Sequence, residues 1–164
     1  MKMELIQPFI NAADAVLAET MKCSTRIGDV NMDEDAYRRK GMAALIVIQG
    51  DIEGHVILDI DAPTAAAIAS ALAGTEVTES DPIVQEAIFE LANLVIGNAV
   101  TTLNDQGFQF KIAPPQAHTE EQGFKGSEDT EALVMCFDIP SGSVFMNVAM
   151  RYNRRRRTER ATAV

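Results

Sequence analysis

The alternation of apolar and polar residues predicts one long helix over residues 81–105, with a single polar stripe along it. Asp81 is suited to cap its N-terminus, and Pro82 suits the first helical position, where a missing N–H costs nothing. At about 100° per residue, the apolar side comprises Val84, Ile88, Leu91, Val95, Ala99 and Leu103. The stripe on the other side comprises Glu86, Glu90, Asn93, Gly97, Thr101 and Asn104. Such a helix is expected to be largely buried, with only the stripe left for solvent or a partner.

The rest of the chain alternates between helical and strand patterns. Residues 5–21 and 63–73 have helical periodicity, and Pro8 is expected in the first turn of the earlier helix, where proline is tolerated. Two hairpins are indicated by runs rich in β-branched residues around glycine-containing turns, and polar connections are expected at 33–40 and 118–130. The predicted strands are 25–32, 43–49, 55–60, 108–112, 132–137 and 144–150.

The order helix, strand, hairpin occurs twice. The two long helices align at an offset of 79 residues and the two hairpins at an offset of 88. The equivalent pairs include Asn11 and Glu90, Asp14 and Asn93, Ala44 and Ala132, and Gly54 and Gly142. This pattern is interpreted as a divergent duplication. It predicts an α+β fold in which pseudo-twofold duplicated helix–strand–hairpin units form a largely antiparallel sheet with long helices packed on it.

Length and charge narrow the picture further. The 164 residues, 47% of them hydrophobic, suit one domain over 1–150. The net charge of −10 is uneven: residues 151–164 carry six Arg and one Glu, which leaves −15 on the body. An acidic body disfavours nucleic acid and favours partners with a basic rim. The Arg-rich end, 151–164, is expected to be a solvated, mobile tail, although its Arg154–Arg157 run could instead bind lipid or nucleic acid.

No membrane span, signal peptide or metal motif is apparent. The apolar runs are short and interrupted, which predicts a cytoplasmic protein without a membrane partner. Cys23 and Cys136 lie in apolar patterns without ligand spacing and are expected to be buried packing residues. His55 and His118 have no ligand partner at i+3 or i+4, so neither a metal site nor a histidine catalyst is expected.

Glu90 and Asn93, one turn apart on the polar stripe, are the candidate site. A carboxamide donates and accepts hydrogen bonds at once, so Asn93 is suited to orienting a water molecule, as amides do in phosphate-hydrolysing enzymes. The carboxylate of Glu90 could dock a cation of a partner. The alternative is that this pair only marks the wet face of a helix, since polar pairs at i,i+3 are common. The confinement of the stripe and the missing side chain at Gly97 favour a site that a partner approaches closely.

These residues carry a resemblance to a known family. Glu90-Leu-Ala-Asn93, followed by Ile96-Gly97-Asn98-Ala99, resembles the ExxN active-site helix of the CheC/CheX family of chemotaxis phosphatases. The opening Glu4-Leu5-Ile6-Gln7-Pro8-Phe9-Ile10 and the turn Gln49-Gly50-Asp51-Ile52-Glu53-Gly54 are also similar to that family. The resemblance spans residues 4–150, and the single motif is closest to the CheX-like branch.

The resemblance implies hydrolysis of the aspartyl phosphate of a phosphorylated CheY-like response regulator. Glu90 would pair with a regulator lysine, Asn93 would align the attacking water, and Glu86 and Gly97 would contact the partner. Mg²⁺ is expected on the regulator, so no cofactor of the chain's own is implied, and a homodimer is expected as in the CheX branch. Glu86 stands where members of the family tend to have Asp or Ser, and Pro114 or Pro115 stands slightly nearer to Asn93 than the usual downstream proline.

Two other functions remain open from the sequence. One is a catalytically inactive CheX-like adaptor that binds a response regulator or another signalling partner through the same helix. The other is a scaffold whose function resides in the Arg154–Arg157 run.

Overall fold

A computed structural model describes residues 3–33, 41–118 and 132–153 of the chain. Most of the predicted connections at 33–40 and 118–130, and the Arg-rich end from residue 154, lie outside the described residues. The elements in chain order are α1 (Met3–Met21), β1 (Arg26–Asp33), β2 (Met42–Gly50), β3 (Ile52–Ile60), α2 (Ala62–Ala73), α3 (Ile83–Asp105), β4 (Phe110–Ile112), β5 (Gln116–Ala117), β6 (Ala132–Ile139) and β7 (Gly142–Tyr152). Both predicted hairpins are present, as β2–β3 and β6–β7.

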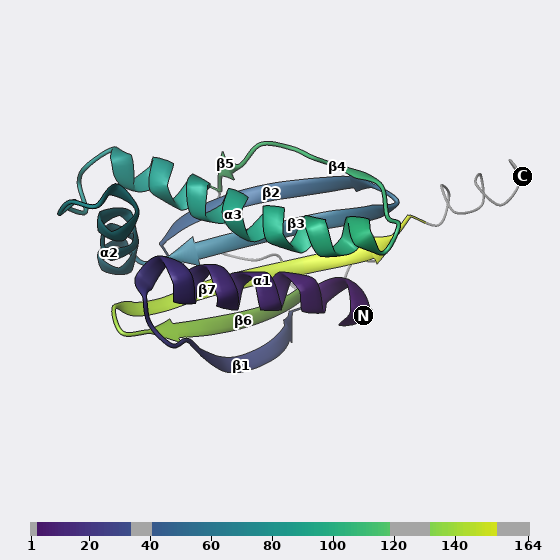
Figure 1. Ribbon diagram of the computed structural model, residues 1–164, viewed down its shortest axis with the longest axis horizontal. Coiled ribbons are helices and arrows are strands. Elements are labelled where there is room, and N and C mark those ends of the chain that lie inside the picture. Colours follow the sequence, from purple (N-terminus) through teal and green to yellow (C-terminus); the bar gives the residue numbers. More distant parts are fainter. Residues whose placement is uncertain (1–2, 34–40, 119–131, 154–164) are drawn as a thin grey trace, which may run out of the picture.

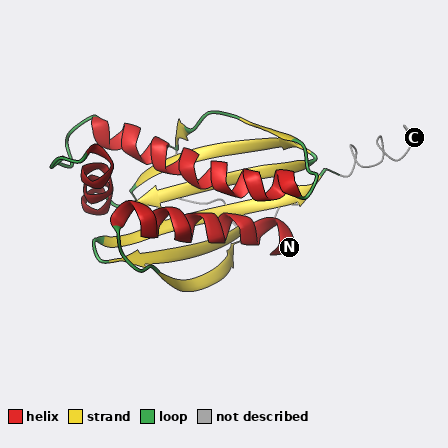
Figure 2. Ribbon diagram, viewed as in Figure 1, coloured by secondary structure: helices red, strands yellow, loops and turns green. Residues whose placement is uncertain are grey.

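The seven strands of the described residues form one sheet, in the order β1-β6-β7-β3-β2-β4, with β5 also paired to β2. Every pairing is antiparallel. Of the described helices, α1 and α3 lie across one face of this sheet, and α2 lies at one end of it, beside α3 (Figure 2). The predicted α+β class and the largely antiparallel sheet are therefore confirmed.

The two halves of the duplication exchange their strands. β1 of the first half pairs with β6 of the second, and β4 of the second half pairs with β2 of the first. The central strands β3 and β7 place Leu58 opposite Met146, which are equivalent residues at the 88-residue offset. The pseudo-twofold axis therefore passes through this residue pair.

The helices are exchanged in the same way. α1 packs on β6 and β7 of the second half, whereas α3 packs on β2 of the first half. α1 and α3 lie side by side and run in opposite directions (Figure 1). One continuous core fills the space between these helices and the sheet, with Leu5, Phe9, Leu58, Leu91 and Phe137 among its buried residues.

The glycine pair predicted to be equivalent occupies equivalent backbone positions. Gly54 has φ 156° and Gly142 has φ 144°, in a region that residues with a side chain rarely adopt. A Cβ atom on Gly54 would lie 1.8 Å from the carbonyl oxygen of Ala149 on the neighbouring strand. Glycine is thus required at Gly54 by the close approach of two backbones.

Several boundaries differ from the sequence prediction. α1 begins at or before Met3, so Pro8 lies beyond the first turn, and the carbonyl of Glu4 cannot receive a helical hydrogen bond from it. β7 continues to Tyr152, past the expected end of the domain at 150. β5 was not predicted, because the prolines at 114 and 115 were taken to end the strand, whereas they only interrupt its pairing with β2.

Of the described helices, α3 alone is long and apolar enough to cross a membrane by length and composition. In its most apolar window 44% of the residues are buried. Its contacts with α1, α2 and β2 identify it as a core helix of this fold, a kind of helix that passes the same test.

Candidate functional site

The start of α3 is fixed by Asp81, as predicted. The backbone N–H of Ile83 donates to Asp81 Oδ1 at 3.0 Å, and the N–H of Val84 donates to the Asp81 carbonyl at 3.0 Å. Pro82 already has helical angles, φ −56° and ψ −24°, so the helical turn begins there although the regular helix is assigned from Ile83. Asp81 therefore occupies the capping position that the sequence predicts for the N-terminus of this helix.

The division of α3 into two sides is confirmed. All six residues assigned to the apolar side are buried, namely Val84, Ile88, Leu91, Val95, Ala99 and Leu103. All six residues of the stripe are exposed, namely Glu86, Glu90, Asn93, Gly97, Thr101 and Asn104. The structure therefore brings the four candidate residues Glu86, Glu90, Asn93 and Gly97 onto one solvent-facing surface.

Gly97 leaves this surface flat. A Cβ atom at this position would meet nothing within 4 Å. The hydroxyl of Thr101 donates to the Gly97 carbonyl at 2.9 Å, which keeps the Thr101 side chain close to the helix. Packing among the described residues does not require a glycine there, although glycine costs helix stability.

Leu94 is a surface feature that the sequence analysis missed. Its side chain is 43% exposed, and it follows Glu90 by one helical turn. The signal was available in the sequence, because Leu94 falls between Glu90 and Asn98 on the helical wheel rather than among the buried residues. The candidate site is therefore not purely polar.

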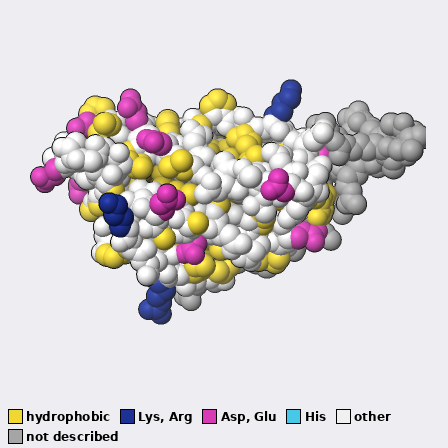
Figure 3. Space-filling view, viewed as in Figure 1, with side chains coloured by type: hydrophobic (Ala, Val, Ile, Leu, Met, Phe, Trp, Pro, Cys, Tyr) yellow, Lys and Arg dark blue, Asp and Glu magenta, His cyan; other side chains and the backbone are white. Residues whose placement is uncertain are grey.

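The helical face of the molecule is acidic. The three helices together carry the carboxylates Glu4, Asp14, Glu19, Glu86, Glu90 and Asp105, and none of them contains Lys, Arg or His. Carboxylates lie over the helices in the space-filling view, while Lys and Arg side chains lie toward its margins (Figure 3). This face is suited to a basic partner surface.

The pseudo-equivalent positions on α1 have a different chemistry. Asn11 and Asp14 are the counterparts of Glu90 and Asn93; Asn11 is exposed and Asp14 is half-buried. Asn11 Oδ1 accepts a hydrogen bond from Gln7 Nε2 at 2.8 Å. Within the described residues, only α3 presents the Glu and Asn pair, as the sequence comparison predicted.

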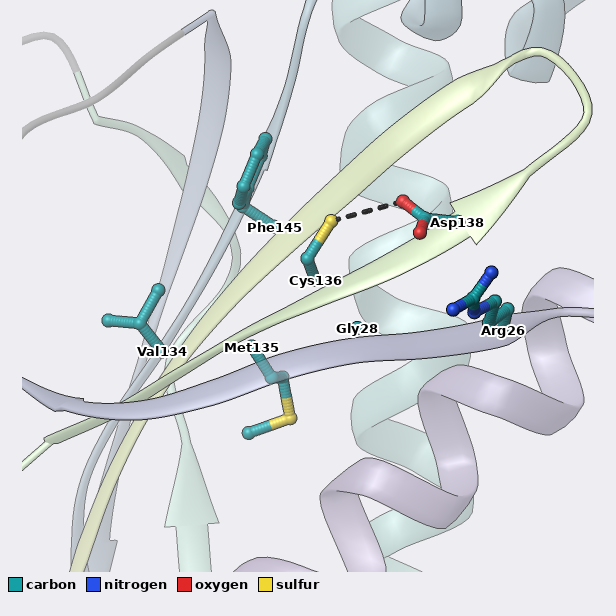
Figure 4. A pocket seen from close by; sticks show the side chains of 7 residues that line it. All are labelled: Arg26, Gly28, Val134, Met135, Cys136, Asp138 and Phe145. Carbon is teal, nitrogen blue, oxygen red and sulfur yellow. Dashed lines mark hydrogen bonds between the residues drawn. The ribbon is translucent and has the colours of Figure 1, made fainter.

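A hollow lies on the face of the sheet opposite the helices, between β1, β6 and β7. It has a volume of about 500 Å³, and Arg26, Cys136, Asp138 and Phe145 are among its lining residues (Figure 4). The Cys136 thiol donates to Asp138 Oδ1 at 3.4 Å, and the Ser143 hydroxyl donates to the same oxygen at 2.9 Å.

The cysteine prediction is partly wrong. Cys23 and Cys136 are free thiols, but each is only partly buried. The Cys136 side chain lies on the face of β6 away from the helices. It lines a hollow there that the apolar pattern of the strand did not indicate.

Among the described residues, no group of three or more His, Cys, Asp or Glu is placed to hold a metal ion. His55 is buried and donates through Nε2 to Asn147 Oδ1 at 2.9 Å. Burial lowers the pKa of His55 below its ordinary value of 6.5; the hydrogen bond with Asn147 opposes this shift, and nearby His118 adds to it. His55 is accordingly a neutral structural residue on the face of the sheet opposite α3.

Comparison with known proteins agrees with this architecture. Residues 42–138, more than half of the chain, match the sequence profile of the family described as chemotaxis phosphatase CheX. The CheX chain in the CheX–CheY–BeF₃–Mg²⁺ complex of Borrelia burgdorferi is 30% identical, with a TM-score of 0.76, and the match covers 92% of this chain and 99% of that one. No curated protein sequence matches the chain.

Two further solved structures share the fold. A CheC-like superfamily protein from Shewanella sp. PV-4 is 22% identical with a TM-score of 0.80, and the match covers 92% of this chain and 99% of that one. CheX from Vibrio vulnificus is 21% identical with a TM-score of 0.77, and the match covers 90% and 99%.

The duplicated fold is that of the CheC-like proteins. Within that class, the chain belongs to the CheX family of chemotaxis phosphatases. This membership confirms the family resemblance seen in the sequence; the roles of individual residues are a separate question.

Proposed function

We propose that this protein hydrolyses the aspartyl phosphate of a CheY-like response regulator. The observation that carries the proposal is the joint exposure of Glu90 and Asn93 on the solvent-facing side of α3, one turn from the open surface at Gly97. The acidic helical face and the CheX relative crystallised with CheY support it.

Asn93 is assigned to the attacking water. Its Oδ1 accepts a hydrogen bond from the water and its Nδ2–H₂ donates to the phosphoryl group, which aligns the water oxygen with phosphorus. As the new P–O bond forms, the bond from phosphorus to the regulator's aspartate breaks. The products are inorganic phosphate and the free carboxylate, and the proton lost by the water leaves with phosphate or solvent. Because Asn93 is neutral, its contribution is positioning rather than proton transfer.

Glu90 is assigned to docking. Its exposed carboxylate can form a charge-assisted hydrogen bond with a regulator lysine, and Glu86 one turn earlier adds to the attraction for basic groups. Mg²⁺, which supplies charge neutralisation at the phosphoryl group, is expected to be held by the regulator.

The decisive experiment measures phosphate release from phosphorylated CheY-like receivers. Wild-type protein should accelerate release, Asn93→Ala should abolish the acceleration while retaining binding, and Glu90→Ala should weaken binding with partial chemistry left. Unchanged hydrolysis by Asn93→Ala would overturn the mechanism. Binding of the receiver without any acceleration by wild-type protein would instead identify an adaptor.

We also propose a cytoplasmic homodimer. β1 is an outer strand of the described sheet, and on it Ile27 and Val30 are 44% and 47% exposed. An outer strand with apolar side chains is suited to pairing with a second copy.

A further inference from the structure

The exposed surface of α3 continues beyond Glu90 and Asn93. Residues spaced four apart form one ridge, consisting of Glu86, Glu90, Leu94, Asn98 and Thr102 and ending at the C-cap Gln106, and all of them are exposed. With a rise of about 1.5 Å per residue, the ridge is about 30 Å long. It crosses the helix obliquely, from the solvent side at Glu86 toward α1 at Thr102.

The far end of the ridge forms one wall of a groove. Asn98, Thr102 and Gln106 of α3 face Gln7, Asn11 and Ala15 of α1 across a hollow of about 440 Å³. Buried Pro8 and Ala12 contribute to its lining, so small apolar groups are flanked by amide side chains. Glu4 closes one end and accepts a hydrogen bond from the Tyr152 hydroxyl of β7. The groove is therefore a formed part of the fold that both helices and the sheet hold in place.

Residues at equivalent positions of α1 and α3 differ in size and charge along this seam. At the 79-residue offset, Gln7, Asn11 and Ala15 of α1 are equivalent to Glu86, Glu90 and Leu94 of α3. Ala15 lines the hollow, whereas its counterpart Leu94 is a projecting side chain that is 43% exposed. One helix seam thus presents an acidic part with an apolar projection beside Asn93 and a hollow lined largely by amides about 12 Å further along α3, from Glu90 to Asn98.

We propose that this ridge and groove form the docking track for the receiver domain of the response regulator. Leu94 and Asn98 set the affinity for the receiver and take no part in the chemistry at Asn93. This inference rests on the function proposed above, and it extends the contact from two residues to a surface. It also gives a role to Asn98 of the Ile96-Gly97-Asn98-Ala99 segment, which the water-positioning mechanism does not use.

The partner is identified by charge and by continuity. The helices carry six carboxylates and no basic side chain, so the docked surface must be basic overall. Leu94 requires an apolar contact, such as the aliphatic stem of a lysine that reaches Glu90. The groove amides can pair with backbone or polar side chains of the same segment. A receiver whose phosphorylated aspartate meets Asn93 would lie over both features at once.

The test uses full-length protein and a panel of CheY-like receivers activated with BeF₃⁻ and Mg²⁺ for binding, or phosphorylated for kinetics. Leu94→Ala should raise Kd and KM about tenfold with kcat unchanged, since an exposed leucine that becomes desolvated on docking is lost. Ile27→Ala is the matched control, because Ile27 is also exposed, at 44%, but lies on β1, away from the ridge and the groove. It should leave both constants unchanged.

Two lysine substitutions test the groove. Asn98→Lys places a cation where a basic surface docks and should raise KM several-fold, whereas Asn104→Lys makes the same change at an exposed position on the opposite flank of α3. Neither substitution touches the core, so all variants should keep the wild-type melting temperature. KM values unchanged by both Leu94→Ala and Asn98→Lys would overturn the docking track and leave the role of Asn93 intact.

The remaining outcomes separate the two proposals. A loss of kcat without a change in KM would place Leu94 and Asn98 in the chemistry and overturn the inference. Binding that weakens in these variants, in a protein without phosphatase activity, would support the docking track and overturn the proposed hydrolysis. The absence of binding to every receiver in the panel would overturn both.

Discussion

His55 and Asn147 are joined by a buried hydrogen bond of 2.9 Å between the two central strands, one from each half of the duplication. The side-chain oxygen Oδ1 of Asn147 can only accept, so His55 Nε2 carries the proton of this hydrogen bond. Both side chains are at most 4% exposed. This burial, which lowers the pKa of His55, couples folding to the protonation of one histidine.

The first prediction is a loss of stability in mild acid. Because burial lowers the pKa of His55 in the folded chain, the unfolded chain binds the proton more readily. The stabilisation is present above pH 6.5, the unfolded value, and is lost as the pH falls through the lower pKa of the folded state. Urea unfolding between pH 7.5 and pH 5.5 should show this decline.

The variant His55→Gln keeps a donor for Asn147 and removes the titration. Its unfolding free energy should change less with pH over the same range than that of wild-type protein. Parallel pH profiles for the two proteins would show that His55 is not responsible.

The second prediction concerns Gly97, where stability and binding should change in opposite directions. Gly97→Ala should raise the unfolding free energy by about 0.5–1 kcal/mol, because alanine has the higher helix propensity and its Cβ meets nothing. The same methyl group should weaken binding of an activated receiver if the partner approaches the helix closely at this point. Chemical denaturation and a binding titration measure the two effects. A more stable variant with wild-type affinity would exclude Gly97 from the interface.

The third prediction is that alanine at position 54 lowers the unfolding free energy, whereas alanine at position 97 raises it. Gly54→Ala would place a Cβ 1.8 Å from the Ala149 carbonyl oxygen, so β3 and β7 must move apart where they pair. The strain at this φ adds to the clash, and a loss of at least about 1–3 kcal/mol in unfolding free energy is expected. Denaturation of Gly97→Ala beside Gly54→Ala provides the control, since the substitution is the same. A Gly54→Ala protein as stable as wild type would show that the two strands separate without cost.

The fourth prediction tests the proposed dimer at the β1 edge. Val30→Lys places a charge on an outer strand, the device by which proteins prevent edge-to-edge pairing. Sedimentation or light scattering should give a dimer for wild-type protein and a monomer for the variant. The control Ile83→Lys, at an exposed apolar position on α3, should keep the wild-type mass. A variant that remains dimeric would place the interface elsewhere.

The sequence predicted the local features of the fold well, because they follow from periodicity over short stretches. The two sides of α3, both hairpins and the Gly54 and Gly142 equivalence were all read from spacing and confirmed in the structure. The exchange of β1 and β4 between the halves was not predicted. It depends on contacts between residues about 100 positions apart, such as Ile27 and Phe137, which no local pattern encodes.

The candidate site was predicted as four polar or small residues, and the structure places all four on the surface. The exposure of Leu94 was missed because the sequence analysis treated apolar residues of this helix as core by default. The groove beside Asn98 could not be foreseen, since it depends on how α1 and α3 pack together rather than on either helix alone.

The exchange of strands and helices means that neither half of the chain contains the neighbours that complete it. A fragment ending after α2 would have β2 and β3 without the α3 that covers β2, and β1 without β6 to pair with. Fragments 1–75 and 76–164 are therefore expected to remain unfolded when separate and to regain the native circular dichroism spectrum when mixed. Complementation of this kind would show that the two halves of the chain associate as two copies of the duplicated unit would. In the function proposed above, α3 carries the chemistry and α1 packs beside it and supports it.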